Sequence, residues 1–188
     1  MPKYNPNLFQ ILARHTFKWS PSTWVAEHGR GGYGVLKVLI AEDDLMIADM
    51  AEDILVAHGY EVCGIARTVA EAVELGLAHR PDFAIIDLRL ANGGLGTDIV
   101  AQLGAVGQLG VLYATGNVAQ VILTAADGHA CLAKPYGPAD LLRGLQIVSD
   151  LFSTGTAATP FPRGLQLLHP ATDQDGDPHY GWERLDKS

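Results

Sequence analysis

The most constraining feature of the sequence is a regular alternation of strand-like and helix-like segments over about residues 35–152. Residues 35–41 (VLKVLIA) are apolar and rich in β-branched side chains, which is typical of a buried strand. Apolar residues then recur at helical spacing until Gly59, where the helix is expected to stop. The same succession continues to residue 152 and makes five strand-helix units. Such an alternation predicts a doubly wound parallel sheet, with helices on both faces and right-handed crossovers.

The boundaries of the predicted helices and strands follow from residues that break secondary structure and from changes in the spacing of apolar residues. Pro81, for example, separates the second predicted helix from the third strand. The predicted strands are residues 35–41, 61–66, 83–87, 110–115 and 129–133, and the predicted helices are about residues 47–58, 69–79, 97–103, 118–126 and 139–152.

The two ends of the chain differ in composition from this central domain. Residues 1–34 mix Pro, Gly and aromatic residues without a regular period, and we expect a flexible arm. A start of translation near Val35 or Leu36 would make this arm an artefact of gene annotation. Residues 153–188 are rich in Pro, Gly and Asp and contain one short apolar patch at residues 165–168, so a disordered tail is predicted.

Composition and charge exclude several functional classes. The chain is 48% hydrophobic and 18% charged, which is typical of a globular protein, and it has no apolar run long enough to span a membrane. The first residues lack the pattern of a secretion signal, so none is expected. The net charge of −8 argues against direct binding of nucleic acid, and a 36-residue tail is too short for a DNA-binding winged helix. We expect a cytoplasmic protein that contacts neither nucleic acid nor membrane.

Polar side chains follow four of the five predicted strands at their carboxyl ends, where ligands bind in doubly wound sheets. These side chains are Glu42 and Asp43 after the first strand, Asp87 at the end of the third, Thr115 at the end of the fourth and Lys134 after the fifth. Carboxylates within about 5 Å of one another repel by on the order of 1 kcal/mol per pair in water, and by several times more in a partly dry cleft. A divalent cation is therefore expected, and hard oxygen ligands favour Mg²⁺.

This set of residues suits phosphoryl transfer onto Asp87. A carboxylate is a competent nucleophile, and the reaction needs mostly positioning and charge neutralisation. Lys134 is a compact cation and Thr115 a hydroxyl donor for the phosphoryl oxygens. A single Asp at a strand end is more often a loop cap, so the interpretation rests on the whole group. Asp44, by contrast, is expected to cap the first helix.

Four ordered motifs, VLIAEDD, FAIIDLRL, YATG and AKPY, resemble the receiver domain of two-component response regulators over about residues 35–152. The resemblance implies a flavodoxin-like, five-stranded sheet of order 2-1-3-4-5. It implies phosphorylation of Asp87 by a histidine kinase, with Mg²⁺ held by Asp43, Asp87 and the backbone carbonyl of Arg89, and with Glu42 acting through water. It also implies that Thr115 moves toward the phosphoryl group, that Lys134 bonds to it, and that the peptide bond between Lys134 and Pro135 is cis.

The sequence departs from the family pattern in two ways. The family usually carries Tyr or Phe three residues before the lysine, whereas this chain has Cys131. The stretch from Thr115 to Lys134 is also short, which predicts a short or loosely ordered fourth helix. In the implied strand order Cys131 and Cys63 lie at opposite sheet edges, so a disulfide between them is excluded.

The run Tyr113-Ala114-Thr115-Gly116 is similar to the FATGUY subfamily of stand-alone receivers, although Asn117 and Val118 break the rest of that motif. The subfamily is associated with kinases of the HWE type, which predicts a sensor kinase of that type as the partner.

Three functions remain open from the sequence. The leading interpretation is a single-domain response regulator, a phosphoacceptor with self-phosphorylation and autodephosphorylation chemistry that signals through protein contacts or acts as a phosphate sink. The alternative is an interaction module that keeps the fold and has lost the chemistry, as Cys131 suggests. A phosphatase of the haloacid dehalogenase type is a third option, but its Asp-x-Asp motif is not matched by Glu42-Asp43-Asp44.

Overall fold

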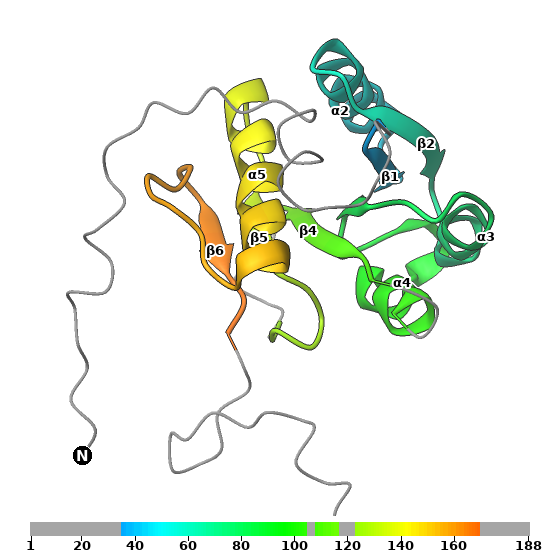
Figure 1. Ribbon diagram of the computed structural model, residues 1–188. Helices are drawn as coiled ribbons and strands as arrows, with labels where there is room; N and C mark the ends of the chain where they lie inside the picture. The colour runs from blue at the N-terminus through cyan, green and yellow to red at the C-terminus, as the bar shows by residue number, and fades with distance from the viewer. Residues whose placement is uncertain (1–34, 105–107, 117–122, 170–188) are drawn as a thin grey trace, which may run out of the picture.

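The computed structural model describes residues 35–104, 108–116 and 123–169. At its centre lies a six-stranded sheet of order β2-β1-β3-β4-β5-β6 (Figure 1). The first five strands are parallel, and β6 runs antiparallel to β5. The strands are β1 (Lys37–Ala41), β2 (Glu61–Ala66), β3 (Phe83–Ile86), β4 (Gly110–Thr115), β5 (Ala130–Ala133) and β6 (Leu165–Leu167), and the helices are α2 (Leu45–Ala57), α3 (Val69–His79), the short 3₁₀ helix η2 (Ala91–Gly93), α4 (Gly96–Leu103) and α5 (Pro138–Thr154).

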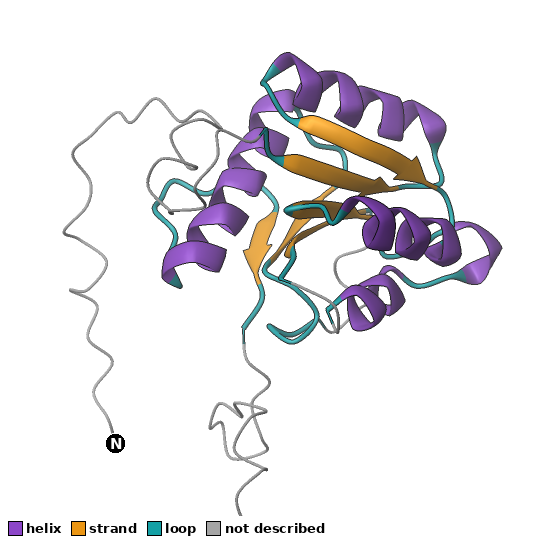
Figure 2. Cartoon of the chain, turned by 45° about the vertical axis from the view of Figure 1, so that its right-hand side comes forward, coloured by secondary structure: helices purple, strands orange, loops and turns teal. Residues whose placement is uncertain are grey.

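Among the described residues, α2 and α5 cover one face of the sheet, and α3 and α4 cover the other (Figure 2). Alternation along the strands distributes the core between the two faces, since successive side chains of a strand point to opposite sides. In β3, Phe83 and Ile85 join the cluster under α2 and α5, while Ala84 and Ile86 join the cluster under α3 and α4. The strand is buried along its whole length, as expected of a central parallel strand.

Local sequence determines where three of the helices begin. The Asp44 carboxylate accepts a hydrogen bond from the backbone N–H of Met46 at 2.9 Å, so Asp44 caps α2 as predicted. Thr68 accepts from the N–H of Glu71 at the start of α3. At the start of α5, Pro138 occupies the first turn and Asp140 accepts from the N–H of Gly137.

The fold class and the order 2-1-3-4-5 of the parallel strands are confirmed. The peptide bond between Lys134 and Pro135 is cis, as the resemblance implies. Cys63 on β2 and Cys131 on β5 are both free cysteines, and three strands separate the strands that carry them.

The structure differs from the sequence predictions in the C-terminal part of the domain. Residues 165–167 form a sixth strand where a disordered tail was expected from residue 153, and α5 extends to Thr154. Of the helix predicted at about 118–126, residues 123–126 are not helical and 117–122 lie outside the described residues. The arm at 1–34 and residues 170–188 also lie outside them. Over the part of the chain that the structure describes, no helix is both long and apolar enough for a membrane span.

Candidate functional site

The predicted site residues are carried by the carboxyl ends of four neighbouring strands. The backbone ladder continues beyond the strand ends: the N–H of Asp87 donates to the carbonyl of Ala41 at 2.8 Å, and the N–H of Lys134 donates to that of Thr115 at 2.9 Å. These two bonds tie the residues after β3 and β5 to the ends of β1 and β4. The parallel register of the sheet therefore determines how the site residues are placed relative to one another.

Three carboxylates meet at this edge. Glu42, Asp43 and Asp87 each offer one oxygen, and the three oxygens lie within 4.8 Å of one another. Glu42 is only 4% exposed, so water screens its charge poorly. At an effective dielectric constant of about 20, two unit charges roughly 4 Å apart interact by about 4 kcal/mol. Ionised carboxylates at this spacing require a nearby positive charge.

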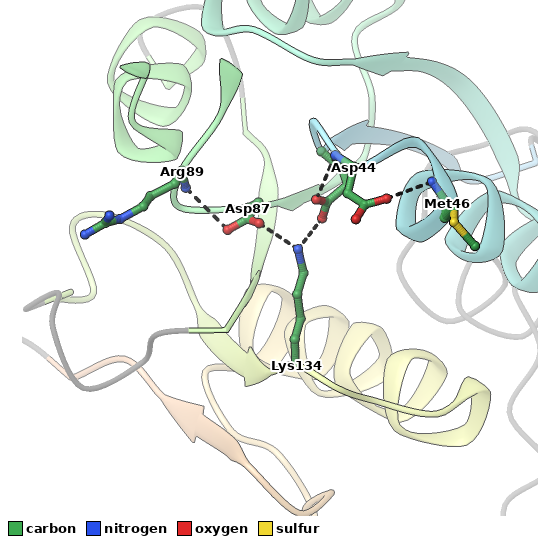
Figure 3. Close-up of polar contacts among 6 residues, drawn as sticks. Asp44, Met46, Asp87, Arg89 and Lys134 are labelled. Carbon is green, nitrogen blue, oxygen red and sulfur yellow. Dashed lines mark hydrogen bonds and ion pairs between the residues drawn. The ribbon is translucent and has the colours of Figure 1, made fainter. Parts of the chain in front are cut away.

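Lys134 supplies such a charge, and its side chain points toward Asp87 (Figure 3). Its ammonium donates to Asp87 Oδ2 at 2.6 Å and also to Glu42 Oε2. Burial acts to lower the pKa of Lys134, but the hydrogen bonds to Asp87 and Glu42 and their negative charges outweigh it, so the pKa lies above its ordinary value. Burial raises the pKa of Glu42 despite the bond to Lys134. Lys134 is therefore held in its charged form.

The other oxygen of Asp87 meets the loop that follows β3. The backbone N–H of Arg89 donates to Asp87 Oδ1 at 3.3 Å (Figure 3). Arg89 is itself held by an isolated bridge to Leu95. Both oxygens of Asp87 thus have a donor, and the main chain of Arg89, the predicted source of a metal ligand, lies beside the carboxylate.

Thr115 is the last residue of β4 and is 4% exposed. Its carbonyl accepts from the backbone of Lys134, which places these two residues side by side at the strand ends. The structure thus brings together Glu42, Asp43, Asp87 and Lys134 through their side chains, and it places Thr115 and Arg89 next to them through the backbone.

The donor set fits a magnesium ion. Mg²⁺ prefers hard oxygen ligands and is usually bound through one or two carboxylates. With all groups ionised, the three carboxylates and the single ammonium leave a net charge of −2. One divalent cation balances this charge, and the carboxylate oxygens are already close enough together to share it.

Two residues next to the site were not predicted from the sequence. Gly96 begins α4, and a Cβ there would lie 2.3 Å from the carbonyl oxygen of Asp87 and 2.6 Å from Ile86 Cγ2. Only glycine lets α4 approach the end of β3 so closely. The Gly-rich run after the third strand was visible in the sequence, but spacing alone does not tell which glycine faces the carboxylate.

The second is Tyr136, which follows Lys134 by two residues and is half-buried. Burial, and then the negative charges of Glu42 and Asp87, raise the pKa of Tyr136 to about 12. Its phenol group therefore stays neutral beside the cluster, and it adds no further charge there.

Sequence comparison agrees with this geometry. Residues 38–146 match the family described as the response regulator receiver domain. The transcriptional regulatory protein PdtaR of Mycobacterium tuberculosis is 31% identical over 125 residues, which cover 64% of this chain and 60% of that protein. The phyllosphere-induced regulator PhyR of Methylorubrum extorquens is 33% identical over 107 residues, or 56% of this chain and 40% of PhyR. The chain thus spans less than two thirds of these relatives.

A shorter relative and two solved structures also align with this chain. The chemotaxis protein CheY of Thermotoga maritima is 30% identical over 117 residues, which are 60% of this chain and 97% of CheY. The crystal structure of PhyR from Brucella abortus aligns with a TM-score of 0.53 at 30% identity, over 63% of this chain and 49% of that one. A receiver domain of a diguanylate cyclase from Desulfovibrio desulfuricans aligns with a TM-score of 0.56 at 27% identity, over 63% and 97%.

Proposed function

Because the chain belongs to the receiver domain family of response regulators, we propose that it is a phosphorelay response regulator whose residues 35–152 accept a phosphoryl group on Asp87. The observation that carries the proposal is the convergence of Asp87 with Glu42, Asp43 and Lys134 at one edge of the sheet. The family has this chemistry, and the cluster has the charges that the chemistry needs.

In the proposed reaction, one carboxylate oxygen of Asp87 attacks the phosphorus of a phosphohistidine on a sensor kinase. A bond forms between this oxygen and phosphorus while the bond from phosphorus to the histidine nitrogen breaks, and the nitrogen keeps the electron pair. Such transfers depend mostly on positioning and on neutralisation of charge. Lys134 already contacts Asp87 and would bond to a phosphoryl oxygen after transfer, and the Thr115 hydroxyl would donate to another.

A Mg²⁺ ion held by Asp43, Asp87 and the backbone carbonyl of Arg89, with Glu42 acting through water, would neutralise the oxygens of the transferring group. Within the protein, the N–H of Arg89 orients Asp87 by bonding to one of its oxygens. Lys134 orients the other oxygen and offsets the charge of Glu42. These contacts hold Asp87 in place before the donor arrives.

The partners proposed here follow from the resemblance. The run Tyr113-Ala114-Thr115-Gly116 supports a kinase of the HWE type as the donor. Output would pass through protein contacts or end in a phosphate sink, in the cytoplasm. A solved PhyR from Bartonella quintana, described as an anti-anti-sigma factor, is 29% identical with a TM-score of 0.52 over 63% of this chain and 48% of that one. A regulator of a transcription factor is accordingly the class of output partner that we propose.

One observation favours a second candidate, an interaction module that works without phosphorylation. Cys131 is 1% exposed and takes the position at which the family carries an aromatic residue. Mg²⁺ affinity separates the two candidates, because a module without the chemistry needs no metal. Titration of the full chain with Mg²⁺ in a calorimeter should show saturable binding that Asp43→Asn weakens and Asp44→Asn leaves unchanged. No saturation for the wild-type chain would favour the interaction module.

Phosphoryl acceptance is tested with the full chain, acetyl phosphate and Mg²⁺. We expect the intact mass to increase by one phosphoryl group, and to return to its original value on hydrolysis of the acyl phosphate. Asp87→Asn should stay unmodified, while Asp44→Asn, which changes a neighbouring helix cap, should be modified as the wild type is. An unmodified wild type, or equal labelling of Asp87→Asn, would contradict the proposal.

A further inference from the structure

A segment after α5 folds back onto the sheet, and we call residues 156–169 the C-terminal strap. Gly155, in the left-handed conformation with φ 72°, ends α5 and turns the chain. Arg143 of α5 holds the first part of the strap: its Nε donates to the carbonyl of Pro160 at 3.2 Å, and its Nη2 donates to that of Ala158. Figure 1 shows the strap, coloured orange, beside α5 and β5. The strap therefore contacts both the last helix and the last parallel strand.

The strap forms hydrogen bonds with the backbone N–H and C=O groups along the outer edge of β5. Leu165, Gln166 and Leu167 pair antiparallel with Leu132, Cys131 and Ala130. The hydrogen bonds continue past both ends of β6, because Ala133 N–H donates to Gly164 and Leu168 N–H donates to His129, each at 3.0 Å. Residues 164–168 thus cover the edge of β5, with the strand at 165–167 and one further hydrogen bond at each end.

Within β6, side chains alternate between the core and solvent, and Leu168 after it packs against the cluster under α3 and α4. Leu165 and Leu167 pack against the cluster under α2 and α5, while Gln166 between them is exposed. Leu165 lies over Gly144 of α5, where an added Cβ would be 3.4 Å from Leu165 Cδ1. We call the outer edge of β5, with the α5 surface at Gly144, the β5 groove. Its occupant presents leucines at alternate positions, with an exposed residue between them.

The strap is weakly embedded compared with the strand that it covers. Ala130, Cys131 and Leu132 of β5 are at most 1% exposed, whereas both leucines of β6 are only half-buried. Elements with few buried contacts open at lower free energy than the core does. Departure of the strap would leave β5 intact on β4, with unpaired backbone groups along an apolar edge, and such edges accept extended peptides as additional strands.

We propose that the β5 groove is a peptide-binding site for an extended Leu-x-Leu segment of a partner protein, and that residues 164–168 of this chain are its intramolecular occupant. The partner segment adds antiparallel to β5, as β6 does, and places its two leucines on the α5 side. The groove ends at Ala133, next to Lys134, so a bound segment lies close to the phosphoryl site. Binding in the groove does not require phosphorylation of Asp87.

The test uses full-length variants that release the strap without changing the groove. Leu165→Asp/Leu167→Asp places two charges at the half-buried positions, and Gln166→Asp/His169→Asp places the same two charges at exposed positions of the same segment. The probe is a fluorescent peptide with the sequence of residues 160–169, PFPRGLQLLH, and binding is followed by anisotropy. We expect saturable binding to the release variant, and binding at least about tenfold weaker to the wild type and to the control, because a tethered occupant has a high effective concentration.

Amide hydrogen exchange shows whether each variant is folded and released. In the release variant the Ala133 N–H should lose protection, while the Asp87 N–H, which bonds to Ala41, should keep it. A folded release variant that does not bind the peptide would overturn the proposal, and so would binding by the wild type and the control that is as tight as binding by the release variant. If the release variant does not fold, Leu165→Ala/Leu167→Ala replaces it, since it removes the packing of both leucines without adding charge. Peptide binding by this variant no stronger than by the wild type would likewise overturn the proposal.

Discussion

The ammonium of Lys134 lies 2.6 Å from Asp87 Oδ2 and also bonds to Glu42, so one cation joins two carboxylates that come from different strands. The backbone of Lys134 is held in turn by the carbonyl of Thr115. This arrangement places one positive charge among three negative ones. The net charge at the sheet edge, and hence the site's response to a metal and a phosphoryl group, depends on Lys134.

Replacing Lys134 by Met should change metal binding and phosphorylation in opposite directions. Loss of the ammonium makes the cluster more negative, and we expect Mg²⁺ affinity to rise by roughly tenfold. The rate of phosphorylation by acetyl phosphate should fall by about 10²-fold, because a charge-stabilising donor is lost. Lys37→Met is the control, since Lys37 forms an exposed ion pair with Glu61 at 3.8 Å, at the start of β1. Lower Mg²⁺ affinity for Lys134→Met would contradict the electrostatic account.

Gly96→Ala should disturb the site through the backbone of Asp87. The added methyl group would meet the Asp87 carbonyl oxygen at 2.3 Å, so either the start of α4 or the end of β3 must move. Overpacking of this kind costs about 1–3 kcal/mol, measurable by urea unfolding, and we also expect weaker Mg²⁺ binding. Gly137→Ala is the matched control, because its Cβ would meet no atom closer than 3.5 Å. Equal stability of the two variants would show that the contact is relieved without cost.

Ser149→Ala should stabilise the protein. Ser149 is 1% exposed, and among the described residues its hydroxyl oxygen has no hydrogen-bond partner. A buried hydroxyl without a partner is unfavourable, so its removal should raise the free energy of unfolding by about 1 kcal/mol. Ser153→Ala, one turn later on α5, removes a hydroxyl that donates to the Ser149 carbonyl at 2.7 Å, and it should give no such gain. Urea unfolding of both variants checks the difference.

The free energy of unfolding should decrease as the pH is lowered, because of His129. Its Nδ1 accepts from the backbone N–H of Val111 at 3.1 Å, and burial lowers the pKa of His129 below its ordinary value of 6.5. As the pH falls through about 6.5, the unfolded chain therefore takes up a proton before the folded chain does, and stability is lost. His129→Asn, whose side-chain oxygen can accept the same N–H, removes this titration.

Urea unfolding of the wild type and His129→Asn at several pH values measures the effect. The difference in unfolding free energy between the two should be constant above about pH 7.5, and the wild type should lose stability relative to the variant below about pH 6.5. A difference that is independent of pH would show that protonation of His129 is not linked to folding.

Much of the fold and most of the site could be predicted from the sequence. Residues 83–86 form a continuous apolar run that ends in Asp87, and such a run is the pattern of a central parallel strand. The carboxyl ends of parallel strands lie along one edge, so carboxylates that follow β1 and β3 must come close together. Local spacing also predicted the cap at Asp44. These features depend on periodicity and on chain direction, which are properties of the sequence itself.

The tertiary structure alone decided the features that depend on contacts between distant segments. Leu165–Leu167 is a short apolar patch among Pro and Gly, and its strand exists because β5 offers an unpaired edge and Gly144 leaves room for Leu165. Likewise, Gly96 matters because α4 passes over the Asp87 carbonyl. Short segments have too few local interactions to specify a conformation, so their structure is determined by the surface that they meet after the rest of the chain has folded.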